Sequence, residues 1–159
     1  SDLTTPYGAH MIIRESTHRF SPLSFHRAMV GQTLPMLLTA AGRAFLAYCP
    51  EEERAEILQL ARSGSDDQAR LAGDPRFVAN VLERTRAAGY GSNEGEWTSQ
   101  RKVGALALPI MRDGLPLGSI NVVYLTRALT LTEAVRRYLP ALRNAVTRIE
   151  QGLVKASGR

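Results

Sequence analysis

The chain has 159 residues, of which 44% are hydrophobic, and one cysteine, so a single domain can bury its own core but no internal disulfide can form. Its longest apolar run covers only residues 105–111 and its N-terminus lacks the pattern of a secretory signal, which excludes a membrane-spanning helix and favours a cytoplasmic protein without a membrane partner. The net charge of +5 equals the surplus of residues 127–159, so the charge indicates a basic C-terminal segment on a nearly neutral body rather than a surface for nucleic acid.

The N-terminal third predicts an irregular start followed by strands and a helix. Residues 1–9 are turn-rich and lack periodicity, whereas residues 10–14 form a short apolar run of strand type. Residues 21–32 indicate a loop and a strand. Residues 34–48 place small and aromatic side chains three to four positions apart, and this spacing predicts a helix over the whole segment.

Two further helices are predicted from their end signals. Pro50 precedes three glutamates, which suit the first turn and the positive end of a helix dipole, and that helix is expected to run to about Arg62. Asp74 followed by a proline is a cap and a first-turn residue, and Gly89 supplies the stop. Residues 90–100 are polar and contain two glycines, which indicates a loop or an irregular edge strand.

Residues 102–125 predict a β-hairpin around an Asp-Gly turn. One alternating set of its residues is small or polar (Ala105, Ala107, Ser119, Asn121 and Val123), and the other is large and apolar (Leu106, Leu108, Ile110, Ile120, Val122 and Tyr124). Because successive strand residues point to opposite faces, the large set predicts a packed face and the small set predicts a cavity or, alternatively, a solvated face. The sets stay apart only if the loop is odd in length, such as residues 112–114 with a glycine bulge.

The last segment predicts a long helix. Thr130 and Glu133 form a capping box, and an apolar stripe continues to Ile149, while Pro140 is expected to kink or split the helix. The element order therefore predicts an α+β fold with an antiparallel sheet.

No catalytic or metal-binding pattern stands out, so neither an active site nor a cofactor is expected. His10, His18 and His26 are eight residues apart, a spacing that suits neither a helical nor a strand metal site. Cys49 has no histidine nearby and is expected to be a buried small side chain. Residues 101–106 begin like an acetyl-CoA loop, but a leucine occupies the position that needs a small residue, which argues against an acetyltransferase.

Several linked motifs occur in order along the chain. Residues 30–47 read VGQTLPMLLTAAGRAFLA, a Pro-Glu-Glu-Glu-Arg run begins at Pro50, and residues 86–90 and 105–110 add RAAGY and ALALPI. Together they resemble the C-terminal effector-binding domain of IclR-family transcriptional regulators, over about residues 9–155. Residues 12–27, 124–128 and 137–142 further resemble a subgroup that regulates the breakdown of hydroxyphenylpropionate and related aromatic acids.

The resemblance implies a GAF-like fold: a curved antiparallel sheet with helices packed on it and a long C-terminal helix. It implies that residues 1–159 are the ligand-sensing domain, that the winged helix-turn-helix that binds promoter DNA is absent from this chain, and that the protein is a homodimer or tetramer. The implied function is to sense a small organic acid, most simply a hydroxylated aromatic acid, and to control transcription of catabolic genes allosterically. The alternatives are a small acyltransferase-like enzyme and a GAF-like dimerisation module without a ligand.

The resemblance also carries the family's pocket contacts onto this sequence. They fall on Ala40 and Ala41, whose backbone amides can receive a carboxylate, and on Asn93, Ala105, Asn121 and Val123, with Glu94 and Trp97 as alternatives to Asn93. Met36 and Trp97 are candidate pocket walls, with ordinary core packing as the alternative for each. Arg43 and His26 are candidate counter-charges for an acidic effector. The set is less polar than in members that sense small oxoacids, which favours an aromatic effector.

Overall fold

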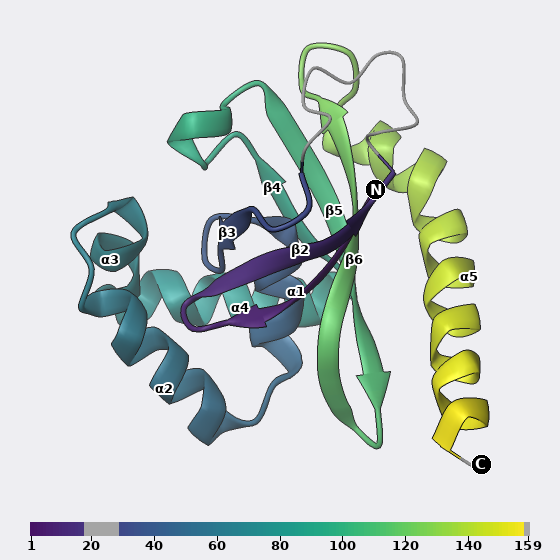
Figure 1. Ribbon diagram of the computed structural model, residues 1–159. Coiled ribbons are helices and arrows are strands. Elements are labelled where there is room, and N and C mark those ends of the chain that lie inside the picture. Colours follow the sequence, from purple (N-terminus) through teal and green to yellow (C-terminus); the bar gives the residue numbers. More distant parts are fainter. Residues whose placement is uncertain (18–28, 158–159) are drawn as a thin grey trace.

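The computed structural model describes residues 1–17 and 29–157, and it is built around one antiparallel sheet (Figure 1). The strand order is β3-β2-β1-β6-β5-β4, and the sheet curls so that β1 and β2 cross the direction of β5 and β6 (Figure 1). The strands are β1 (Asp2–Tyr7), β2 (His10–Ser16), β3 (Thr33–Pro35), β4 (Gly91–Glu94), β5 (Val103–Arg112) and β6 (Leu115–Leu125).

The helices cover both faces of this sheet. They are α1 (Ala40–Tyr48), α2 (Glu51–Arg62), α3 (Asp67–Ala72), α4 (Pro75–Ala88) and α5 (Leu131–Ser157), with a short 3-10 helix, η2 (Thr98–Gln100). Helix α1 lies on β4, β5 and β6 and is backed by α4, whereas α5 packs on the opposite face of β5 and β6 (Figure 1). The predicted α+β fold, with a curved antiparallel sheet and a long C-terminal helix, is confirmed.

The helix ends that were predicted from capping residues and prolines are confirmed. Helix α2 begins directly after Pro50, Asp74 caps α4 through the amides of its first turn, and Gly89 ends α4 with φ of +76°. In the capping box of α5 the backbone N–H of Thr130 donates to the carboxylate of Glu133 at 2.9 Å. Of the two effects expected of Pro140, a kink or a split, the split is wrong: Pro140 lies inside one continuous helix. It lies on the exposed side, where water can satisfy the carbonyl that loses its partner.

Two N-terminal predictions are wrong. Residues 1–9, expected to be irregular, contain β1, which pairs with both β2 and β6; such pairing depends on distant residues, which local propensity does not report. The helix expected from residue 34 begins only at residue 40, because Thr33–Pro35 pair as β3 and the Thr39 side chain caps α1. Helix α3 was not predicted. The strand expected within residues 21–32 falls largely outside the described residues.

The β5–β6 hairpin separates its two sets of side chains, though by a different device from the one predicted. Its loop has two residues, Asp113 and Gly114, both with positive φ, as in the tight turns that suit hairpins. A bulge then follows: Ile110 pairs with Gly118 and Met111 with Pro116, so one residue of β6 is passed over. The extra residue in the bulge has the same effect on register as an odd-length loop. Ala105 therefore pairs with Val123, and the small and large side chains stay on separate faces.

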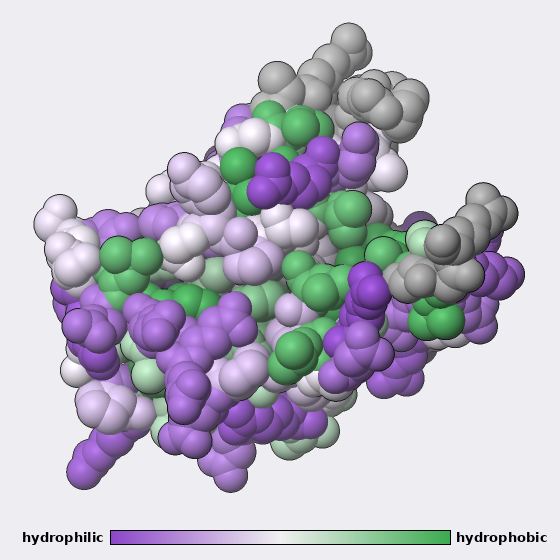
Figure 2. Space-filling model, turned by 60° about the horizontal axis from the view of Figure 1, so that its bottom comes forward, coloured by the Kyte–Doolittle hydropathy of each residue, from purple (hydrophilic) through white to green (hydrophobic). Residues whose placement is uncertain are grey.

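Most apolar surface of the described chain is internal. The large set of hairpin residues packs with α5, while the small set joins α1 in the main core. On the face shown in Figure 2, hydrophilic side chains surround separate groups of apolar ones. No helix in the described part of the chain is long and apolar enough to cross a membrane.

Candidate functional site

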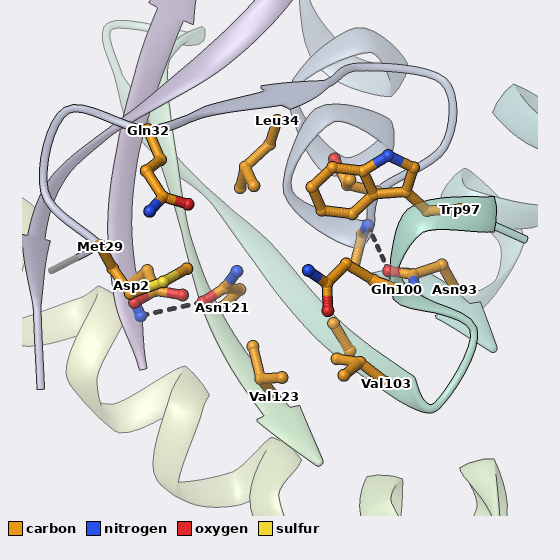
Figure 3. A pocket seen from close by; sticks show the side chains of 13 residues that line it. Asp2, Met29, Gln32, Leu34, Asn93, Trp97, Gln100, Val103, Asn121 and Val123 are labelled. Atoms are coloured by element: carbon orange, nitrogen blue, oxygen red, sulfur yellow. Dashed lines mark hydrogen bonds between the residues drawn. The ribbon is translucent and has the colours of Figure 1, made fainter. Parts of the chain in front are cut away.

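A cavity of about 110 Å³ opens between the small face of the hairpin, the start of α1 and residues 95–102, here called the 95–102 loop (Figure 3). Residues from five strands, from α1 and η2, and from the loops beside them meet around it. Its lining consists of Asp2, Met29, Gln32, Leu34, Thr39, Ala40, Asn93, Trp97, Gln100, Val103, Ala105, Asn121 and Val123.

Small residues in β4 and β6 let the first turn of α1 approach the sheet closely. A Cβ atom on Gly91 would lie 2.3 Å from the carbonyl oxygen of Ala40, so β4 and the first turn of α1 can touch only because this residue is glycine. The Ser119 hydroxyl donates to the carbonyl oxygen of Ala41 at 2.9 Å and ties β6 to the same turn. Beside this contact the side chain of Ala105 lines the cavity.

Two buried asparagines present amide donors to the cavity. The Oδ1 atom of Asn93 accepts the backbone N–H of Ala40 at 2.8 Å, and the Oδ1 atom of Asn121 accepts the backbone N–H of Asp2 at 2.9 Å. Because each oxygen is fixed by a backbone donor, the NH₂ group of each side chain is the part left for a ligand. The site therefore offers neutral hydrogen-bond donors from opposite walls (Figure 3).

The polar side chains gather at two ends of the cavity, with apolar ones between them. Asp2, Gln32 and Asn121 lie at one end, and Asn93, Gln100 and Trp97 lie at the other (Figure 3). Leu34 and Val123 form the walls between these ends (Figure 3). Such a cavity suits a flat apolar body that carries a polar group at each end.

The expected counter-charge, Arg43, does not face this cavity. Its Nη1 atom lies 2.9 Å from Oε1 of Glu96, and it lines a separate, more polar cavity of about 130 Å³ with Arg84 and Tyr90. Burial acts to raise the pKa of the Glu96 carboxyl, but the charge and hydrogen bond of Arg43 outweigh it and leave that pKa below its ordinary value. The prediction is corrected because a buried guanidinium needs a carboxylate of its own. His26, the other candidate, lies outside the described residues.

The structure brings six of the eight predicted site residues to the cavity: Ala40, Asn93, Trp97, Ala105, Asn121 and Val123. Met36 is not among the lining residues and is 1% exposed in the core, and Ala41 is buried behind its contact with Ser119. Glu94, an alternative to Asn93, is exposed and lines the second cavity instead. The role of all these residues in binding stays a prediction.

Sequence reasoning missed the lining residues of the N-terminal strand and of the segments that follow β2 and β4. They are Asp2, Met29, Gln32, Leu34, Thr39, Gln100 and Val103. Asp2 and Thr4 are both buried, on the same face of β1. The sequence does not reveal this face, because it is defined by the pairing of β1 with β6. A strand whose residues are mostly polar and show no hydrophobic alternation is hard to find from sequence.

Reactive groups are few in the described part of the chain. No group of three histidine, cysteine, aspartate or glutamate side chains there is arranged to hold a metal ion. His10 lies in β2, and His18 falls outside the described residues. Burial raises the pKa of the Cys49 thiol to about 11, so this side chain stays protonated and packs as a small apolar group.

Comparisons with known proteins give a consistent result. Residues 3–151 match the family described as "Bacterial transcriptional regulator IclR C-terminal". An IclR-family transcriptional regulator from Brucella abortus is similar in fold, with a TM-score of 0.75 and 22% identity over 95% of this chain and 55% of its own. A transcriptional regulator from Rhodococcus sp. RHA1 has a TM-score of 0.73 and 22% identity over 98% of this chain. This chain therefore spans 62% of the Rhodococcus protein's length.

A third similar structure contains a ligand. It is the inducer-binding domain of a double mutant of the PobR transcription factor from Acinetobacter, in complex with 3-hydroxybenzoic acid. Its TM-score is 0.71, with 17% identity over 94% of this chain and 86% of its own. At this level of identity the likeness concerns the fold.

Proposed function

This chain belongs to the IclR C-terminal family of bacterial transcriptional regulators, and from that premise we propose that its cavity binds a small hydroxylated aromatic acid as effector. The chain is an effector-binding domain of such a regulator. Its family and similar structures are transcriptional regulators rather than enzymes, so the acyltransferase-like alternative is set aside.

The observation that carries the proposal is the arrangement of the cavity, with two polar ends and an apolar middle. Its volume of about 110 Å³ is close to the ~150 Å³ of an engineered apolar cavity that holds benzene. One aromatic ring between Leu34 and Val123 would therefore fill the middle. The PobR domain, whose fold is similar, has been crystallised with 3-hydroxybenzoic acid, which supports this class of ligand.

The charges at the two ends favour one orientation of the ligand. Asp2 is 2% exposed and accepts a hydrogen bond from the Ser16 hydroxyl at 2.7 Å, so a buried carboxylate already stands at its end of the cavity and disfavours a second one there. The opposite end holds the Asn93 amide and the N-terminal turn of α1, whose dipole favours an anion. We expect the ligand's carboxylate there and its hydroxyl near Asp2.

The regulatory mechanism proposed is a population shift. The effector binds one of two conformations better and moves the equilibrium toward it, by no more than its difference in affinity for the two. In the whole protein we propose a cytoplasmic homodimer or tetramer that controls catabolic genes through a separate winged helix-turn-helix bound to promoter DNA. Residues 1–159 would then be its sensing domain.

The test is a thermal-shift screen against benzoates with and without a hydroxyl, hydroxyphenylpropionates, cinnamates and short oxoacids. A binder present at 100 times its Kd adds about 2.7 kcal/mol of stability, which raises the Tm of a domain of this size by roughly 5 to 10 °C. Hydroxylated aromatic acids are expected to shift the Tm more than oxoacids or the benzoates without a hydroxyl. If no compound shifts it, the GAF-like dimerisation module without a ligand becomes the better account.

A further inference from the structure

We propose that the Arg43–Glu96 ion pair is a latch that holds the 95–102 loop, and Trp97 with it, closed over the cavity. The pair would then set effector affinity as a pair of positioning residues, without touching the effector. The part of this inference that concerns affinity rests on the proposed function, whereas the position of the loop does not.

Arg43 is a fixed anchor inside the fold. Its side chain is 8% exposed, and its Nε atom donates to the carbonyl oxygen of Leu37 at 2.9 Å. Its Nη1 atom donates to the carbonyl oxygen of Ser92 at 2.6 Å and to Glu96 at 2.9 Å. One guanidinium thus joins the segment before α1, the edge strand β4 and the 95–102 loop, and its planar fork allows these bonds to form together.

The carboxylate of Glu96 holds the loop at its first turn. Its Oε1 atom accepts from Arg43, and its Oε2 atom accepts the backbone N–H of Glu94. The next residue, Trp97, points into the cavity with Gln100 from the same loop (Figure 3). The two ends of the loop also meet closely, since a Cβ atom on Gly95 would lie 2.6 Å from the carbonyl oxygen of Arg101. A movement of Glu96 would therefore be passed to Trp97.

Where the loop joins β5, the backbone N–H of Thr126 donates to the carbonyl oxygen of Lys102 at 3.0 Å. Among the described residues, the other side-chain hydrogen bond of the loop is weaker than the ion pair. The Thr98 hydroxyl lies 3.1 Å from Oδ2 of Asp67, and this pair is exposed to solvent. Exposed interactions of this kind contribute little because water competes for both partners. Loss of the Glu96 carboxylate, in contrast, leaves the buried charge of Arg43 without its counter-ion, which is costly as long as the loop stays closed. The ion pair is thus the contact that selects the closed position.

The chain offers a direct readout and a matched control. Trp97 is the only tryptophan, so its fluorescence reports the loop in protein without any effector. Glu94 lies two residues before Glu96, is exposed, and makes no ion pair with the described residues. Glu96→Ala breaks the latch, Glu96→Gln keeps an acceptor for Arg43 but removes the charge, and Glu94→Ala is the control.

The first measurement is acrylamide quenching and the emission maximum of Trp97 without effector, beside far-UV circular dichroism. Glu96→Ala is expected to shift emission to the red and increase quenching with unchanged secondary structure, Glu96→Gln to lie between it and wild type, and Glu94→Ala to match wild type. If both Glu96 variants fluoresce like wild type, the latch is wrong whatever the cavity binds. The Gln variant decides the matter if the Ala variant loses its secondary structure.

The second measurement is the Kd of the best compound from the thermal-shift screen. If the open loop lowers the binding-competent fraction to about one tenth, the apparent Kd rises about tenfold, and Glu94→Ala leaves it unchanged. An unchanged Kd in Glu96→Ala overturns the effect on affinity. If Trp97 is released in the variant but wild type binds no compound, the latch stands and the proposed function fails.

Discussion

The two faces of the β5–β6 hairpin are packed differently, although the same two strands form both. On one face, large side chains such as Leu106 and Tyr124 fill the space beneath α5. On the other face, small side chains such as Ala105 and Ala107 meet α1 at one point and leave a cavity beside it. One face of the hairpin is therefore packed along its length, while the other is packed only in part and leaves the cavity.

The difference depends on register as well as on composition. A shift of one residue between the strands would place large and small side chains on the same face. The bulge opposite Ile110 and Met111 prevents this. A small local irregularity at the tip of the hairpin thus preserves the cavity between the hairpin and α1.

The largest effect is expected on the filled face. Leu106 is fully buried between the sheet and α5, so Leu106→Ala removes packed atoms and leaves a void, which lowers the free energy of unfolding by about 2–5 kcal/mol. Urea denaturation measures this change. Leu117→Ala, at a 42% exposed position of the same strand pair, is the control and should stay within about 0.5 kcal/mol of wild type.

Smaller changes in stability are expected on the face with small side chains, and they should differ between its packed part and its open part. Ala107 is fully buried on the α1 side and does not line the cavity, so Ala107→Val overpacks the core and lowers stability by about 1–3 kcal/mol. Ala105 lines the cavity, so Ala105→Val should leave urea stability within about 0.5 kcal/mol and weaken effector binding about tenfold. Equal destabilisation by both variants would contradict the presence of free space at Ala105.

The smallest effect concerns the loop that closes the cavity and depends on pH. The groups around Glu96 are Arg43 from α1, Arg84 from α4, and Tyr90 and Glu94 beside or in β4. Burial acts to raise the pKa of the Glu96 carboxyl, but the charge and hydrogen bond of Arg43 lower it by more, so the pKa lies below its ordinary value of 4.5. A depressed carboxyl pKa gives stabilisation that is complete above the unfolded value and is lost as pH falls through the folded value.

Trp97 quenching should therefore be constant from about pH 8 to 5 and increase only below about pH 4.5, the ordinary glutamate value. The amplitude should match the difference between wild type and Glu96→Gln and stay below that of Glu96→Ala, because a protonated carboxyl still offers Arg43 an acceptor oxygen. Glu96→Gln should lose the transition. A transition of the same size in that variant would assign it to another group.

Local signals in the sequence were enough for the parts of the fold whose stability is local. Pro50, Asp74 and Gly89 end or begin helices through their own backbone preferences, and the structure places them as predicted. Strand β1 could not be found this way, because its residues become a strand only by pairing with β2 and β6. The start of α1 was misplaced for a related reason: Thr33–Pro35 have a strand partner in β2.

The residues of the candidate site likewise fall into those that local sequence patterns predict and those that depend on distant partners. The alternation of the hairpin and the family resemblance pointed to Ala105, Asn121 and Val123, which line the cavity together. Asp2 was missed because it belongs to the unpredicted strand, and Arg43 was misassigned because its partner Glu96 lies 53 residues along the chain. Such a pairing is set by tertiary structure and leaves no local pattern.

We propose that an aromatic effector occupies the cavity on the small face of the hairpin. The most direct test is NMR of the ¹⁵N-labelled chain during titration with 3-hydroxybenzoate. The account predicts saturable shifts of the Trp97 indole N–H and of the side-chain amides of Asn93 and Asn121, with α5 amides unchanged. Saturable shifts confined to α5, or none at these three side chains, would contradict it.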